Sequence, residues 1–139
     1  MKGTIEFTHD SENDVVIVTP RWSIETTADI KAWADQWSGW FEQHRRGKKS
    51  DVVIVLHEFH VAKPVAREWG VARAAMVERY MRYSFRVDAD SIVSFYVNTS
   101  GAKYNVATNE AASVADAIAG ILNARKPRAG DRPRVPSRF

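Results

Sequence analysis

The chain of 139 residues is long enough for one domain with a substantial hydrophobic core. It contains no cysteine, which excludes disulfides and thiolate metal sites and is compatible with the cytoplasmic location that we expect. The net charge of +3 is unevenly distributed, because residues 125–139 carry six basic side chains and one acidic one, whereas the first 124 residues carry 14 basic and 16 acidic side chains.

Apolar runs in the sequence are short. The first residues contain no extended apolar stretch typical of a secretion signal, and the longest apolar run, Val52–Leu56, is far shorter than the roughly 20 residues that span a membrane. We therefore expect a soluble protein without a membrane-spanning segment.

Two strands joined by a turn are predicted at the start. Thr4–Thr8 alternates apolar and polar residues, as a half-buried strand does, and a polar cluster over residues 9–14 indicates a turn. Val15–Val18 is a continuous β-branched run typical of a strand that is covered on both faces. We expect Pro20 to end this second strand, because proline has no backbone N–H for a sheet. The pattern predicts an opening hairpin.

The next element is a helix. Thr26 and Asp29 form a capping-box-like pair at its start, and Arg45, Arg46 and Gly47 mark its end. Apolar or aromatic residues recur at the three- and four-residue spacing of one helical face, at Ile30, Trp33, Trp37, Trp40, Phe41 and His44.

A central strand and a second helix follow. Asp51–Leu56 has the apolar pattern of a buried strand, and we expect a loop over His57–Lys63. Pro64 suits the first position of a helix. Helical spacing then continues through Val65, Trp69, Ala72, Arg73, Met76, Tyr80 and Tyr83.

The remaining predicted elements are a strand over Ser91–Asn98, at most a short strand over Tyr104–Ala107, and a last helix that begins with Thr108 or Asn109 as its cap. The element order predicts an α/β fold, in which a mixed sheet of about five strands with an opening hairpin is covered by about three helices. We expect one domain over residues 1–124 and a disordered basic tail over residues 125–139, which is rich in arginine and proline.

The strand runs Val15–Val18 and Val52–Leu56 and the closing Ala-Ser-Val-Ala-Asp-Ala-Ile segment resemble the STAS family of anti-sigma-factor antagonist domains, over roughly residues 4–122. The resemblance implies a bacterial signalling module that acts by docking to other proteins. Signalling members carry a phosphorylatable Ser or Thr after the central strand, but neither residue type occurs from Asp51 to Tyr83. The resemblance therefore implies a divergent member without this phosphoacceptor.

The first candidate site is the loop after the central strand, because open α/β sheets bind ligands at the carboxyl ends of their strands. His57, Glu58 and His60 are titratable side chains in this loop, and Lys63 beside the next helix could attract an anion. Imidazole and carboxylate groups could bind zinc, but the spacing differs from His-Glu-x-x-His and a third ligand is not evident. We assign the loop to ligand or partner binding, and we expect no metal, cofactor or catalytic residue.

The second candidate site is the tryptophan row at Trp33, Trp37 and Trp40. Core packing is one interpretation. The alternative is a surface for a partner or ligand, since three indoles on one helix offer more aromatic area than packing on a sheet usually needs, and exposed tryptophan is a frequent interface anchor.

The basic tail raises the question of nucleic-acid binding, because arginines neutralise phosphates. No aromatic residue interleaves the arginines from Arg125 to Arg138, which favours a solubilising terminus. We predict a non-enzymatic module that docks to a protein partner or to a second copy as a homodimer. The alternatives are a carrier or sensor of a small apolar ligand, and a nucleic-acid-associated protein that uses the tail.

Overall fold

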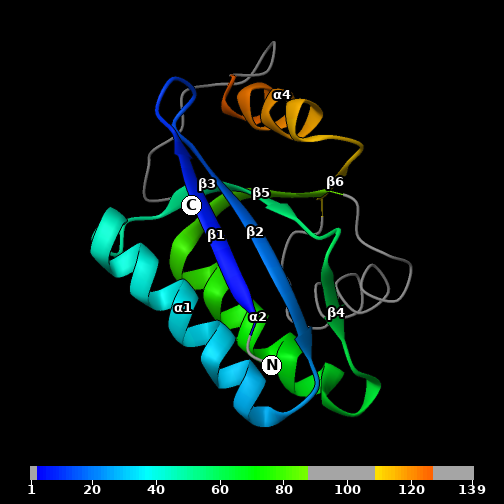
Figure 1. Cartoon of the computed structure of the whole chain (residues 1–139). Helices are drawn as coiled ribbons and strands as arrows, with labels where there is room; N and C mark the ends of the chain where they lie inside the picture. The colour runs from blue at the N-terminus through cyan, green and yellow to red at the C-terminus, as the bar shows by residue number, and fades with distance from the viewer. Residues whose placement is uncertain (1–2, 88–108, 127–139) are drawn as a thin grey trace.

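The centre of the fold is a mixed β-sheet (Figure 1), shown by a computed structural model that describes residues 3–87 and 109–126. The strand order is β1-β2-β3-β5-β6, and β4 pairs with β2 beyond the end of β3. β1 and β2 are antiparallel, and all other pairings are parallel. The six strands in the described ranges are β1 (Thr4–Asp10), β2 (Val15–Ile24), β3 (Ser50–Val55), β4 (Phe59–Val61), β5 (Met81–Val87) and β6 (Asn109–Ala111). The predicted α/β class with a mixed sheet is confirmed.

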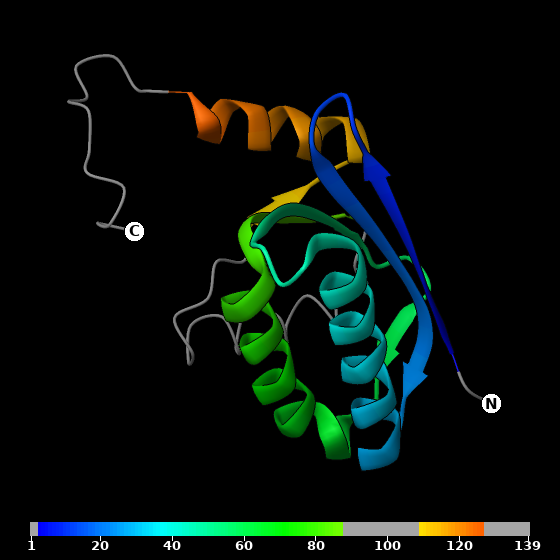
Figure 2. The same ribbon diagram turned by 90° about the vertical axis from the view of Figure 1, so that its left-hand side faces the viewer.

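Helices cover both faces of this sheet. The described helices are α1 (Thr27–Arg45), α2 (Ala66–Tyr80) and α4 (Val114–Arg125), and a short 3-10 turn, η1 (Lys63–Val65), precedes α2. Figure 2 shows α1 and α2 side by side, with α4 apart from them. Val16 and Val52 pack in the core beneath α1 and α2, whereas Val15 and Val53 pack with Ile121 of α4. The side chains of neighbouring strand residues therefore pack on opposite faces of the sheet, because side chains alternate between the two faces along a strand.

The opening hairpin is confirmed, but Pro20 does not end its second strand. β2 continues to Ile24, and Pro20 lies opposite Ile5 of β1. On its other edge, β2 pairs with β3 over Val15–Val18 and with β4 over Trp22–Ile24. Pro20 occupies the gap between these two pairings, so its missing N–H interrupts no ladder on that edge.

The ends of α1 follow the predicted signals. The backbone N–H of Asp29 donates to Thr26 Oγ1 at 3.1 Å, and the backbone N–H of Thr26 donates to Asp29 Oδ2 at 3.0 Å, which completes a capping box. At the other end, Arg46 and Gly47 have φ values of 52° and 71°. The Gly47 N–H donates to the carbonyl of Phe41 at 3.2 Å, so the left-handed turn satisfies a helix-terminal acceptor.

Two predicted boundaries around α2 are wrong. The expected loop over residues 57–63 contains β4, whose short run Phe59–Val61 extends the pairing of β2. The second helix ends at Tyr80 and does not reach Tyr83 as predicted, because Met81–Val87 forms β5 between β3 and β6. The three-residue spacing from Tyr80 to Tyr83 fits a helix, but Tyr83 already belongs to β5, where apolar residues follow the two-residue period of a strand.

The C-terminal boundaries also differ from the prediction. Asn109–Ala111 is β6, and α4 begins later than expected, with Ser113 as its cap. Arg125, which we placed in the tail, is the last residue of α4 and binds Asp51. The expected strands at 91–98 and 104–107, the cap candidate Thr108 and tail residues 127–139 lie outside the described residues. Over the described ranges, no helix has the length and apolarity to cross a membrane.

Candidate functional site

The predicted loop residues are spread over three short segments of the surface. His57 and Glu58 lie in the connection from β3 to β4, and Glu58 Oε2 accepts from Arg21 Nε of β2 at 2.7 Å. His60 is exposed on β4 opposite Ser23, and Lys63 is the exposed first residue of η1. Among residues 3–87 and 109–126, no group of three or more His, Cys, Asp or Glu side chains is placed to hold a metal ion.

The tryptophan row divides into an inner and an outer part. Trp33 and Trp37 are buried, with ring centroids 5.8 Å apart. Trp40 is only half-buried, and its ring stacks on Phe7 and on His44, each at 4.8 Å between centroids. Of the three indoles, only that of Trp40 has surface to offer a protein partner.

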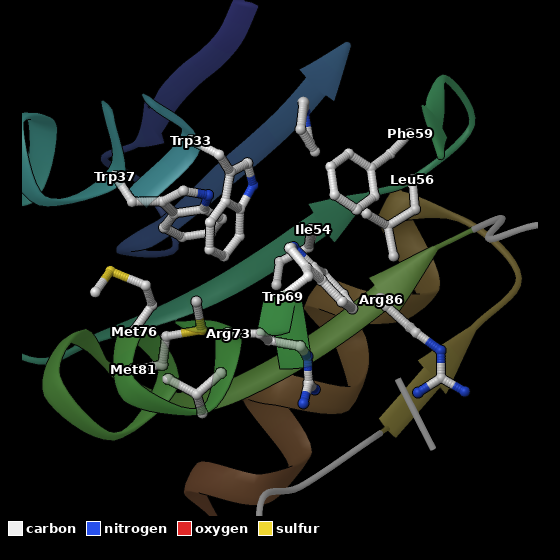
Figure 3. Close-up of a pocket in the computed structure, with 12 residues that line it drawn as sticks. Trp33, Trp37, Ile54, Leu56, Phe59, Trp69, Arg73, Met76, Met81 and Arg86 are labelled. Carbon is white, nitrogen blue, oxygen red and sulfur yellow. The ribbon is translucent and has the colours of Figure 1, made fainter. Parts of the chain in front are cut away.

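Trp33 and Trp37 line a pocket between α1, α2 and the sheet (Figure 3), which we call the aromatic pocket. The space between its atoms is about 440 Å³, including open solvent at the mouth. Most of the wall is apolar. Its aromatic residues are Trp33, Trp37, Phe59 and Trp69, and its aliphatic and thioether residues are Pro20, Ile54, Leu56, Met76, Val77 and Met81. Two arginines, Arg73 and Arg86, complete the lining.

The positions of the lining residues on α2 and β5 follow from the periodicity of a helix and of a strand. On α2, Trp69, Arg73 and Val77 are four residues apart and therefore share one face. On β5, Phe85 and Val87 pack toward α4, so Arg86 between them projects to the α2 side.

The indole N–H groups of Trp33, Trp37 and Trp69 are buried in this region and find no hydrogen-bond acceptor among the described residues. A buried N–H that has lost water without gaining an acceptor costs free energy. Polar donors of this kind in an apolar wall are typical of a site that receives a ligand or ordered water.

The two arginines bring positive charge into the same pocket. Arg73 is 8% exposed and Arg86 is 6% exposed. Burial, together with the nearby charge of Arg86, lowers the pKa of the Arg73 guanidinium to about 10. Burial also lowers the pKa of Arg86, and Glu110 of β6 opposes this shift, with its Oε2 lying 3.8 Å from Arg86 Nε. Both guanidinium groups are still protonated near neutral pH.

Most of the aromatic pocket was missed from the sequence. We identified Trp33 and Trp37 as site residues, but Trp69, Arg73 and Arg86 were not assigned to a site. One signal was present, because Arg73 occupies an apolar position in the helical spacing of residues 65–83. For Arg86 the signal was hidden, since β5 itself was not predicted.

Comparison with known proteins found no matching family model and no curated protein with significant sequence similarity.

Proposed function

We propose that this protein is a non-enzymatic binding domain that holds a small apolar ligand in the aromatic pocket, as a carrier or sensor does. The observation that carries the proposal is the set of three buried indoles whose N–H groups have no acceptor in the described part of the chain, in the wall of a mostly apolar pocket. Concave, mostly apolar sites with a few polar groups are the usual form of small-molecule sites.

The ionisable groups in this wall support binding without catalysis. The titratable residues that line it are Arg73 and Arg86, and a guanidinium that stays protonated near neutral pH is a poor general acid or base. Such groups orient or hold a ligand. We also propose a cytoplasmic location, which the absence of cysteine from the sequence supports.

A filling mutation in α2 tests the proposal. Val77→Phe places a larger side chain in the pocket wall, and we expect it to weaken binding of 1-octanol by roughly 10- to 100-fold, as an overpacking cost of about 1–3 kcal/mol implies. Titration of the intrinsic tryptophan fluorescence measures this, because three tryptophans line the site. Val71→Phe is the matched control, since Val71 is on the same helix and 50% exposed. Equal affinity in the two variants would contradict the proposal.

A second candidate, which keeps the STAS-type docking role, is self-association through the half-buried Trp40. Its ring is held between Phe7 and His44, so little side-chain entropy remains to be lost on binding. We expect a dimer in sedimentation experiments at high micromolar concentration, which Trp40→Ala shifts to monomer while Gln43→Ala on the same helix does not. A wild-type protein that is monomeric under these conditions rules this candidate out.

A further inference from the structure

We propose that the aromatic pocket selects small neutral carbonyl compounds, such as ketones and esters, whose polar group accepts hydrogen bonds and donates none. This inference rests on the proposed function and adds the ligand class. The indoles of Trp33, Trp37 and Trp69 place buried N–H donors in the pocket wall, and these donors find no acceptor in the described part of the chain.

The three indoles form one group in the wall. The ring centroids of Trp37 and Trp69 are 5.8 and 5.9 Å from that of Trp33, so the three rings are neighbours (Figure 3). Each of these residues is at most 4% exposed. An indole N–H can only donate, whereas a carbonyl oxygen has two lone pairs and accepts from two donors. One ligand carbonyl in this region therefore removes the cost of more than one unpaired N–H.

Acceptors are scarce in the same lining. Among the described residues that form it, none is Asp, Glu, Asn, Gln, Ser, Thr, Tyr or His, and the thioethers of Met76 and Met81 are only weak acceptors. A ligand hydroxyl that enters this region loses the hydration of its own donor and gains no strong side-chain acceptor, while a ketone has no donor to lose. An ionised group loses far more hydration than neutral indole N–H groups can offset, so the selected class is neutral.

Three probes of similar shape separate the acceptor from the donor: 2-hexanone, 2-hexanol and 2-methyl-1-hexene, in which a C=CH₂ group replaces the carbonyl. Each is titrated against the protein in ¹H–¹⁵N NMR spectra. We expect 2-hexanone to bind at least about 5-fold more tightly than 2-hexanol, because the alcohol buries an unpaired donor. The alkene neither donates nor accepts a strong hydrogen bond, so its affinity reports the apolar contribution alone.

The indole signals in the same spectra report the hydrogen bond directly. The chain has five tryptophans, of which Trp22 and Trp40 do not line the pocket and serve as internal controls. We expect 2-hexanone to move the N–H proton signal of at least one lining indole downfield, as acceptance of a hydrogen bond does. The alkene should move that signal less, and the two control signals should not follow the ketone.

Phenylalanine variants locate the donor. Trp33→Phe, Trp37→Phe and Trp69→Phe each remove one N–H, keep an aromatic ring and assign one indole signal. We expect the variant that lacks the bonded donor to weaken 2-hexanone binding about 5-fold more than alkene binding, as the loss of one hydrogen bond implies. Trp40→Phe is the matched control, because Trp40 is on the same helix as Trp33 and outside the pocket lining. Circular dichroism verifies that each variant is folded.

The outcomes distinguish this inference from the proposed function. If 2-hexanol binds as tightly as 2-hexanone, or if the ketone moves no lining indole signal further than the alkene does, selection for an acceptor is refuted and the apolar site remains. If none of the three probes binds, the proposed function itself fails, and the inference with it. Should a phenylalanine variant lose its native spectrum, the indole shifts of the wild-type protein decide.

Discussion

Replacement of Trp37 with alanine should lower the free energy of unfolding by about 3–5 kcal/mol, the cost of removing a large aromatic side chain from a core. Trp37 is 1% exposed. Its ring stacks on Phe41 with centroids 5.6 Å apart, and it meets the ring of Phe7 edge-on at 5.7 Å. The side chain thus joins α1 to β1, and its loss enlarges the neighbouring pocket instead of allowing the core to close.

Urea unfolding followed by circular dichroism measures this loss. Gln43→Ala is the control, because Gln43 is exposed on the same helix and its truncation should change stability by less than about 0.5 kcal/mol. A loss below about 1 kcal/mol for Trp37→Ala would show that the side chain is not part of the packed core.

The second large effect concerns Asp51 at the start of β3, which is 4% exposed. Its carboxylate accepts from Arg82 at 3.0 and 2.8 Å, from Arg125 Nε at 2.8 Å and from the Tyr83 backbone N–H at 3.2 Å. Arg125 also donates to the backbone carbonyl of Asn13 at 2.7 Å. Asp51 therefore connects β5, the end of α4 and the β1–β2 turn.

We expect Asp51→Asn to lower the free energy of unfolding by about 3 kcal/mol at neutral pH, because hydrogen bonds to charged groups are lost and an amide N–H faces the guanidinium groups. Asp35→Ala is the control. Asp35 forms an exposed pair with Lys31 at 2.8 Å, and surface pairs of this kind contribute less than about 1 kcal/mol.

The Asp51 effect should depend on pH. Burial alone raises the pKa of this carboxyl group, but the hydrogen bonds from Arg82 and Arg125 outweigh burial, so the pKa is lowered overall. A carboxyl group whose pKa is lower in the folded protein contributes its full stability above the unfolded pKa, near 4, and loses it as the pH falls through the folded pKa. The stability difference between wild type and Asp51→Asn should therefore shrink below about pH 4. An unchanged difference at about pH 3 would contradict this account.

Much of the fold could be predicted because its signals are local. The capping box of Thr26 and Asp29 and the left-handed end at Gly47 depend on residues within a few positions of each other. The runs Val15–Val18 and Val52–Leu56 are apolar on both faces, and this requires a sheet that is covered by helices on both sides. Local geometry and binary pattern were sufficient for these elements.

Contacts between distant segments decided the rest. β4 has three residues, too few for a period, and forms because β2 extends past β3. Asp51 and Arg125 are 74 positions apart, and no pattern in either segment indicates that they bind. Arg73 of α2 and Arg86 of β5 line the same pocket only because α2 packs beside β5. The sequence alone determined the opening hairpin, α1 and the central strand β3, and which of their faces are apolar, because these features depend on neighbours in the chain. Only tertiary packing determined the pocket, because burial and electrostatic coupling depend on neighbours in space.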